Sequence, residues 1–552
     1  MRRGTLSVLA LLLILVLGCQ PAPPAAPTAA PPVTGKPAAP TAAAPAPVSA
    51  ATPAAPAAPA QPTAQPATAA AKSMDRLVIS QVTDANGLPS VNPIDRLHTL
   101  LPRNFIYDQL LTRDQSGIKP MLAESVQATD PTHYRIVLRR GVKFHNGELL
   151  DAASVKASFD FLATAPETGL FHRYFVGYKE STVVDDHTVD MVLSAPNVLV
   201  PAGLTQVPIF PASQMTNNPV QQLADRKLIG TGPYKLASFS PNESVTLAAF
   251  DDYWGGKPPF REVVLKNVPE ASTRIAELQA GTTQIVGDVP SRKIAEIERI
   301  PGAKIVTEPG IRSAYIIMSP KLAPLNNAKV RQAIYYAVDR KALTTALFDK
   351  YADPAVSPAH TRSAGSVPAF PLEDFSPDKA KALLKEAGVT TPLTLDLDVA
   401  PVYVDVAQVL QAQLKAVGIN VTINSIEATA TLTQAKRLDA KTTPTMVMNV
   451  GLDNIELDSY FTMYAYVGRP DGFANGLGYP AWPAFDDLMT RYLAASDQAA
   501  RTDLAKQALE VVKAEMPIVW LYHPQRVYAV AGSVEYTPRG DGQLRLQDVR
   551  PK

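Results

Sequence analysis

The chain has 552 residues, of which 46% are hydrophobic, so it exceeds what one hydrophobic core normally serves and predicts two or three lobes. Its 52 basic and 51 acidic side chains nearly cancel, which argues against nucleic-acid binding, because that requires clustered positive charge. The single cysteine, Cys19, excludes an intrachain disulfide and a cysteine-based zinc site.

The N-terminus has the features of an export signal. Arg2 and Arg3 precede an apolar run over residues 6–17, which is too short for a stable membrane-spanning helix. The four residues that end at Cys19, Val-Leu-Gly-Cys, resemble a bacterial lipobox, which implies cleavage before Cys19 and diacylglycerol on its sulfur. The alternative is an ordinary signal peptide with an incidental cysteine. We predict that residues 1–18 are a lipoprotein signal peptide.

Residues 19–73 form a predicted linker. After Cys19 the stretch is almost entirely Ala, Pro and Thr, with Lys36 and Lys72 as its only charges. This composition cannot form a packed core, and Pro-rich chains favour extended polyproline II. We therefore expect a disordered, semi-rigid spacer that holds the folded body on the order of 100 Å from the membrane, at about 3.1 Å per residue.

Two Gly-rich motifs flank a predicted hairpin. Residues 230–235, Gly-Thr-Gly-Pro-Tyr-Lys, predict a tight turn that enters a strand over 234–239, and a second strand follows at 244–250. The hairpin ends in the bend Asp-Tyr-Trp-Gly-Gly-Lys-Pro at 252–258. In this order and spacing the motifs closely resemble the peptide- and nickel-type solute-binding proteins that serve ABC importers, bacterial extracellular solute-binding family 5. In that family the segment is scaffold.

The resemblance covers about residues 75–540. It implies an α/β fold with two lobes of the periplasmic-binding-protein type II kind and an additional small third domain. The domains expected from it are lobe I, built from 74–105, 195–268 and 520–552, an augmenting domain at 106–194, and lobe II at 269–519. At the start of the augmenting domain, residues 104–111 predict a helix, and Asp151 is expected to cap the helix that follows it.

No motif for catalysis or for a cofactor is present. The seven histidines are scattered without the spacing of a metal site. Lys257 does not belong to a phosphate loop, because Asp251 and Pro258 occupy positions that such a loop reserves for Gly and for Ser or Thr. We predict that the chain is not an enzyme and binds neither cofactor nor metal. A tethered hydrolase with residues far apart in sequence is the alternative.

One segment predicts a ligand site. An apolar strand from Met446 runs into an acidic loop that contains Asp453 and Glu456, where a desolvated carboxylate needs a cationic partner. By resemblance to the peptide-binding branch, Asp453 is expected to receive the α-amine of the ligand. A solvated acidic turn is the alternative.

Three further residues are predicted to bind the ligand: Tyr403, His98 and Thr99. The segment with His98 and Thr99 lies where members of the resembled family send residues into the cleft. The alternative for His98 is a surface histidine.

The loop also departs from the resembled family. Val450 and Leu457 replace a tryptophan and a proline that are common in peptide binders, and residues 396–406 lack the arginine that dipeptide binders use for the ligand carboxylate. These departures favour a longer, amidated, cationic or uncharged ligand over a short peptide with a free carboxylate.

The predicted function is therefore a monomeric solute-binding lipoprotein. It would be held at a membrane on the periplasmic or extracellular face and would deliver an oligopeptide or related amine-bearing solute to the permease of an ABC importer. A metal complex or an oligosaccharide as ligand, or a role as a surface sensor, remain open alternatives, whereas nucleic acid is excluded as a partner.

Overall fold

The computed structural model describes residues 75–81, 104–164, 174–216, 218–241, 243–360, 363, 375–426, 445–451, 458–464, 479, 482–540 and 544–552. All of them belong to one compact unit, Ala71–Lys552. The predicted signal peptide, the linker and Cys19 lie outside the described residues. Within the described ranges, no helix combines the length and the apolar character that crossing a membrane requires.

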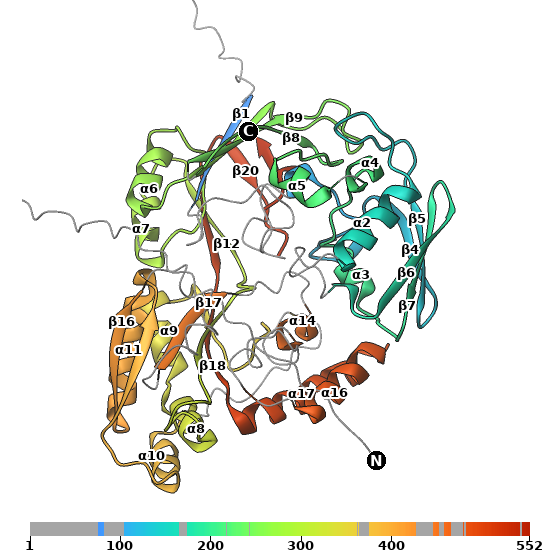
Figure 1. Cartoon of the computed structure of the whole chain (residues 1–552). Coiled ribbons are helices and arrows are strands. Elements are labelled where there is room, and N and C mark those ends of the chain that lie inside the picture. Colours follow the sequence, from blue (N-terminus) through green and yellow to red (C-terminus); the bar gives the residue numbers. More distant parts are fainter. Residues whose placement is uncertain are drawn as a thin grey trace, which may run out of the picture. The chain divides into compact units, whose positions relative to one another are not determined.

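A seven-stranded mixed sheet, in the order β12-β19-β11-β1-β10-β9-β8, contains the predicted hairpin as β8 and β9 (Figure 1). Its strands are β1 (Arg76–Gln81), β8 (Tyr234–Ser240), β9 (Ser244–Ala249), β10 (Glu262–Asn267), β11 (Ile285–Val286), β12 (Lys304–Glu308) and β19 (Arg526–Val530). β1 pairs in parallel with both β10 and β11, so the first described strand lies inside the sheet.

A six-stranded sheet has the order β14-β18-β13-β17-β15-β16. Its strands are β13 (Ser313–Met318), β14 (Ala352–Pro354), β15 (Leu393–Val399), β16 (Ile419–Ser425), β17 (Thr445–Gly451) and β18 (Ile518–Pro524). Side chains alternate along β13: Tyr315 and Ile317 join one hydrophobic cluster, whereas Ala314 and Ile316 join another. The sheet is therefore buried on both faces.

Helices cover both faces of this sheet. The cluster with Ile316 includes side chains from α8 (Ala328–Ala337), α9 (Arg340–Phe348), α10 (Pro377–Glu386) and α11 (Val404–Ala416). The cluster with Tyr315 includes side chains from α14 (Ser459–Met463), α16 (Pro483–Ala494) and α17 (Gln498–Glu515). Layers of helices on a mixed sheet confirm the predicted α/β class.

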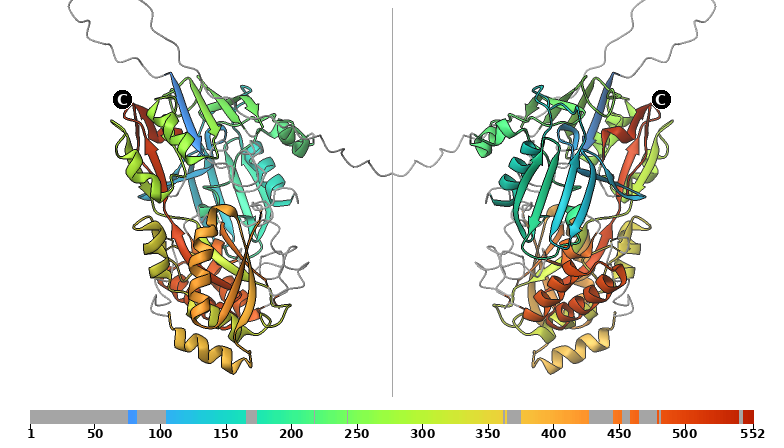
Figure 2. Two further views of the ribbon diagram at one scale, coloured as in Figure 1. Left: turned by 90° about the vertical axis from the view of Figure 1, so that its left-hand side faces the viewer. Right: turned by 90° about the vertical axis from the view of Figure 1, so that its right-hand side faces the viewer.

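A third, antiparallel sheet has four strands side by side in the order β4-β5-β7-β6 (Figure 2). The strands are β4 (Ala123–Asp130), β5 (His133–Leu138), β6 (Tyr178–Asp185) and β7 (Thr188–Leu193), and α2 (Ala152–Thr164) packs against β6 and β7. The predicted cap of this helix is confirmed, because Asp151 Oδ1 accepts a hydrogen bond of 2.8 Å from the Ser154 amide.

Short elements complete the described chain. Two-stranded sheets pair β2 (Leu111–Asp114) with β3 (Gly117–Pro120) and β20 (Val534–Tyr536) with β21 (Val549–Pro551). The remaining helices are α3 (Val200–Gly203), α4 (Ala212–Met215), α5 (Pro219–Ala224), α6 (Ala271–Gln279), α7 (Ile294–Ile297), and the 3-10 turns η2 (Ser291–Lys293), η4 (Pro401–Tyr403) and η6 (Leu546–Asp548).

The predicted helix over residues 104–111 is wrong. Only 104–106 are helical, Gln109 forms a β-bridge with Pro208, and β2 begins at Leu111. Every residue of this segment is buried, so it lacks the exposed face of an amphipathic helix. Its backbone instead pairs with the Gly-rich turn, since the Gly232 amide donates to the Ile106 carbonyl at 2.9 Å.

The predicted lobe boundaries remain a prediction, but the sheets pair strands across two of them. β11 and β12 were expected in lobe II, yet both pair within the seven-stranded sheet. β18 runs on to Pro524 within the six-stranded sheet, beyond the boundary expected at residue 519. The chain passes between the two sheets after β12 and again between β18 and β19.

Candidate functional site

The predicted ligand loop follows one end of the six-stranded sheet. β15 and β17 are parallel, and they end at Val399 and Gly451. The antiparallel β13 begins at the same edge, where Ser313 is the strand partner of Gly451. Ligands of α/β proteins commonly bind beyond the carboxyl ends of parallel strands. Asp453 and Glu456 come two and five residues after Gly451 in the sequence, and both lie outside the described residues.

Aromatic and amide side chains meet just before the end of β17. Asn449 Nδ2 donates a hydrogen bond of 3.3 Å to the Tyr315 hydroxyl. The Tyr315 ring packs edge-on against Trp520, with ring centroids 5.6 Å apart. Asn449 Oδ1 accepts from the Val450 amide at 2.8 Å, so the side chain is held at both ends. The last residues of β17 therefore have fixed side-chain positions.

A buried carboxylate lies on the same sheet face. Asp398 of β15 is fully buried, its strand partner on β17 is Val447, and Asn424 Nδ2 donates to Asp398 Oδ1 at 3.0 Å. Leu397 and Val399 pack on the opposite face, with α11. Asp398 was not among the residues predicted from the sequence. The signal that identifies it is the alternation Leu-Thr-Leu-Asp-Leu-Asp-Val, which places both acids on one face.

The far end of the predicted loop is fixed by Asp458. Its Oδ1 accepts 2.9 Å hydrogen bonds from the Tyr460 amide, which caps α14, and from the Tyr492 hydroxyl. Burial raises the pKa of Asp458 to about 6, and these two hydrogen bonds oppose the rise. The two described residues that flank the predicted loop in sequence, Gly451 in the sheet and Asp458 at the helix cap, are therefore both held in place.

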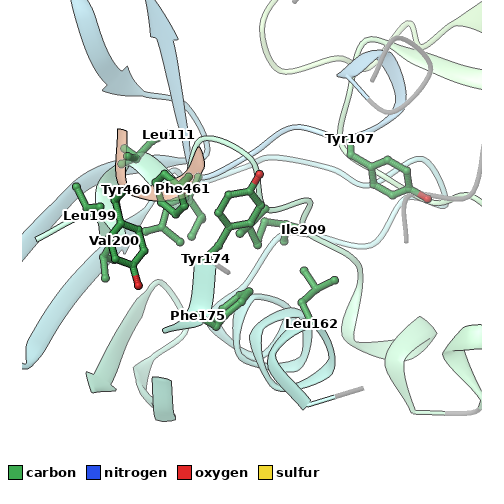
Figure 3. Packing of buried hydrophobic residues seen from close by; sticks show 14 of the residues in the cluster. Tyr107, Leu111, Leu162, Tyr174, Phe175, Leu199, Val200, Ile209, Tyr460 and Phe461 are labelled. Atoms are coloured by element: carbon green, nitrogen blue, oxygen red, sulfur yellow. The ribbon is translucent and has the colours of Figure 1, made fainter. Parts of the chain in front are cut away.

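The helix after the loop packs on residues that precede β6 and follow β7 of the four-stranded sheet. Tyr460 and Phe461 of α14 lie beside Tyr174 and Leu199 (Figure 3). The rings of Tyr174 and Phe461 meet edge to face, with centroids 5.6 Å apart. The helix α14, which follows the predicted loop in the sequence, therefore contacts residues beside the four-stranded sheet.

Tyr403 is the one predicted site residue of the folded body that the structure describes. It ends η4, precedes α11, is half-buried and packs against the cluster that contains Tyr522. Burial raises the pKa of Tyr522, and the nearby Tyr403 phenol raises it further. His98 and Thr99 lie outside the described residues, so the grouping of the predicted site remains a prediction.

The part of the chain that the structure describes contains no group of three or more His, Cys, Asp or Glu side chains that could hold a metal ion. Asp398 accepts a hydrogen bond from the Asn424 amide, and Asp458 accepts from a backbone N–H and a phenol and is also near the charges of Arg501 and Arg113. Both carboxylates are therefore engaged by groups of the chain itself.

Comparison with known proteins gives one family match. Residues 117–471 match the family described as bacterial extracellular solute-binding proteins, family 5 Middle. The dipeptide-binding protein of Escherichia coli K12 is 29% identical over 437 residues, which cover 73% of this chain and 80% of that protein. The glutathione-binding protein GsiB of Pectobacterium atrosepticum is 29% identical over 415 residues, covering 73% and 79%.

Solved structures share the fold. DppA of Helicobacter pylori, in complex with the peptide STSA, has a TM-score of 0.76 at 23% identity and covers 87% of this chain and 99% of that one. NikA of Staphylococcus aureus, in complex with Ni(L-His)2, has a TM-score of 0.73 at 21% identity, with coverages of 86% and 100%. At these identities the similarity establishes the arrangement of the chain.

Proposed function

Because the chain belongs to family 5 of the bacterial extracellular solute-binding proteins, as its motifs indicated, we propose that it captures an oligopeptide or related amine-bearing solute and delivers it to an ABC importer. The observation that carries the proposal is the edge at which the parallel strands β15 and β17 end, because β17 ends at Gly451, the residue that precedes the acidic segment 452–457 in the sequence. It is the position at which α/β proteins commonly bind ligands.

The ligands named for four of the similar proteins share one chemical feature. Peptides, glutathione and the L-His of a nickel complex all carry an amino group. A carboxylate that is partly removed from water binds an ammonium group by charge-assisted hydrogen bonds. Asp453 is the residue proposed for this contact, with Glu456 in the same loop and Tyr403, His98 and Thr99 as further ligand contacts.

The acids around the loop favour a positively charged ligand. Asp398 of β15 shares a sheet face with its strand partner Val447 of β17, the strand that precedes Asp453 in the sequence. Residues 396–406 contain three acidic and no basic side chains. A short peptide with a free carboxylate would find no arginine in this segment. The proposed ligands are therefore longer peptides, amidated peptides or cationic amines.

Binding would act by closing two lobes around the ligand. We assign lobe I to the seven-stranded sheet and lobe II to the six-stranded sheet, with the four-stranded sheet as the augmenting domain. A ligand shifts such an equilibrium only by the free energy with which it prefers the closed state. The closed form would then dock on the permease, whose ATPase supplies the energy for transport.

The proposal includes a tether and excludes turnover. Cleavage before Cys19 and acylation of its sulfur would hold a monomeric protein at the outer face of a membrane, and the Pro-rich linker would set its reach. The proposed role requires no catalytic residue and no cofactor.

The test is native mass spectrometry of residues 71–552, the compact unit, purified without denaturant. We expect a small molecule to be released whose mass and fragmentation identify a peptide or an amine. Calorimetry with that molecule should then show affinity lowered at least about tenfold in Asp453→Asn, as expected for loss of a charge-assisted contact.

Asp503→Asn is the matched control, because Asp503 is an exposed aspartate on α17, where it hydrogen-bonds Gln507. Equal affinities of the two variants would contradict the role of Asp453. Release of an oligosaccharide or a metal complex would replace the proposed ligand class, and hydrolysis of the released ligand would indicate an enzyme.

A further inference from the structure

A pocket of about 240 Å³ lies beside the seven-stranded sheet. It is lined by Tyr234 at the start of β8, by Tyr253 and residues 255–259 in the connection from β9 to β10, and by Gln547 and Arg550 near the C-terminus. Its walls thus come from both Gly-rich motifs and from η6 and β21. All of these residues are described, and no function has been assigned to them above.

The floor of the pocket is held in place. Tyr253 is 9% exposed, and its hydroxyl lies 3.5 Å from the carboxylate of Asp108. Gly255 lies against the Tyr253 ring so closely that a Cβ there would stand 2.5 Å from a ring carbon. Only glycine permits this approach. The other phenol, Tyr234, is fully buried and accepts from the Phe260 amide at 3.4 Å.

Two cations contribute to the rim. Lys257 follows the glycine pair, and Arg550 stands on β21, where it lies near enough to Tyr234 for its charge to act on that phenol. Both side chains are exposed, and within the described residues neither is recorded in an ion pair. Glu535 is the strand partner of Arg550 and is the nearest competing acid in the ladder. The pocket therefore combines a rigid aromatic floor with positive charge.

Gln547 adds a polar group. Its Nε2 donates to the Tyr253 hydroxyl at 3.4 Å, whereas its Oε1 is buried and has no hydrogen-bond partner in the described structure. An amide oxygen only accepts hydrogen bonds and offers nothing to an anion, so Gln547 contributes to the pocket by holding the Tyr253 hydroxyl in place.

We propose that this pocket binds a small molecule that carries a carboxylate or phosphate group. Lys257 and Arg550 would pair with the anion, and Arg would do so through two parallel N–H donors. The ring of Tyr253 and the prolines at 258 and 259 would contact the apolar part of the ligand. The volume lies below the ~300–1,000 Å³ typical of sites for drug-sized ligands, so the ligand would have the size of a small metabolite.

The test uses the full chain and two probes, succinate for the carboxylate and inorganic phosphate for the phosphate, in calorimetric titrations at low ionic strength. We expect saturable binding of at least one probe, weakened about tenfold in Lys257→Gln and in Arg550→Gln, because each variant removes a charged contact. Lys415→Gln, at an exposed lysine on α11, is the matched control and should bind as the wild type does.

The two variants also separate this pocket from the ligand loop. Binding that survives unchanged in both variants belongs elsewhere and overturns the proposal, as does the absence of saturable binding of either probe to the wild type. Asp453→Asn should leave probe binding at this pocket unchanged. Thermal unfolding of each variant checks that it is folded. If Lys257→Gln does not fold, the result for Arg550→Gln decides the test.

Discussion

Trp254 donates a hydrogen bond of 2.7 Å from its indole nitrogen to the carboxylate of Asp108. Thr231, from the first Gly-rich motif, donates to the same carboxylate at 3.3 Å. The two motifs, about twenty residues apart in sequence, are therefore joined through one buried side chain of the segment that precedes β2. This explains in physical terms how both motifs hold the fold together: Thr231 and Trp254 bind a buried carboxylate of the chain itself, whereas Lys257 of the second motif is exposed.

Asp108 should make stability depend on pH. Burial raises its pKa to about 7, against the hydrogen bond from Trp254 and the charge of Arg545, which lower it. The folded protein therefore keeps a proton that the unfolded chain releases above about pH 4, so this contribution to stability is complete below pH 4 and is lost as the pH rises through 7.

We expect the free energy of unfolding of the wild type, relative to Asp108→Asn, to fall by on the order of 4 kcal/mol between pH 4 and pH 8. Urea unfolding of both proteins across this range measures the difference, and the pairing cancels contributions of other titrating groups. A difference that does not vary with pH would show that Asp108 is ionised throughout.

His145 should make stability depend on pH in the opposite direction. Its Nε2 donates to the Gly232 carbonyl at 2.9 Å, and its Nδ1 accepts from the Gly230 amide at 3.3 Å. Burial lowers the pKa of His145 to about 4, below the unfolded value of about 6.5. The folded state therefore disfavours protonation of His145. The contribution of the neutral imidazole to stability is complete above pH 6.5 and is lost as the pH falls to 4.

The measurement compares the wild type with His145→Gln in urea between pH 7 and pH 4. The stability of the wild type relative to the variant should decline by about 3 kcal/mol over this range, because 2.5 pKa units at about 1.4 kcal/mol each are at stake. No decline between pH 7 and pH 4 would contradict a buried, neutral imidazole, because it would mean that His145 takes up a proton as readily in the folded as in the unfolded state.

Gly310 should not tolerate a side chain. It lies between β12 and β13, where a Cβ would stand 2.0 Å from the Pro524 carbonyl oxygen at the end of β18. Both connections between the two large sheets meet at this contact. Gly310→Ala should lower the free energy of unfolding by about 1–3 kcal/mol, as overpacking does elsewhere.

Gly287→Ala is the control for this change, since its Cβ would meet Gln81 Cβ at 3.3 Å, a contact that a displacement of a few tenths of an ångström relieves. Chemical denaturation of both variants gives the comparison. If Gly310→Ala were as stable as Gly287→Ala, the two connections would have enough space for a methyl group, and the predicted steric clash would be wrong.

Cys19 should determine where the protein fractionates. The lipobox predicts that the wild type pellets with membranes and is released by detergent, whereas Cys19→Ser remains in the aqueous fraction. Intact mass spectrometry of the purified wild type should show the mass of attached acyl chains. Thr28→Ser, a conservative change in the linker, should fractionate as the wild type does; aqueous wild-type protein would refute the anchor.

Local patterns in the sequence predicted the elements with clear periodicity. The strands of the β8–β9 hairpin, the helix after Asp151 and the strand into the acidic loop all appear where alternation or capping indicated. The segment 104–111 failed because it is buried on every side, so its apolar residues have no period from which a helix could be distinguished.

Long-range pairing was beyond local patterns. Nothing in the residues of β12 indicates that its partner is β19, more than 200 residues later, and this pairing moves β12 into the seven-stranded sheet. For the site, Asp453 was chosen from its motif, whereas Asp398 was missed because an alternating acid looks like a solvent-exposed position until the second face of the sheet is known to be buried.

Both ends of the described chain attach to the same half of the protein. The Asp75 carbonyl accepts from the Arg261 amide beside β10, and the Lys552 amide donates to the Ser533 carbonyl next to β20. A biosensor built on the folded body can therefore be attached to a support at Asp75 or at Lys552 without a link to the six-stranded sheet. A fluorophore placed on the six-stranded sheet would then test the proposed closure, because its distance from the support should change when ligand binds.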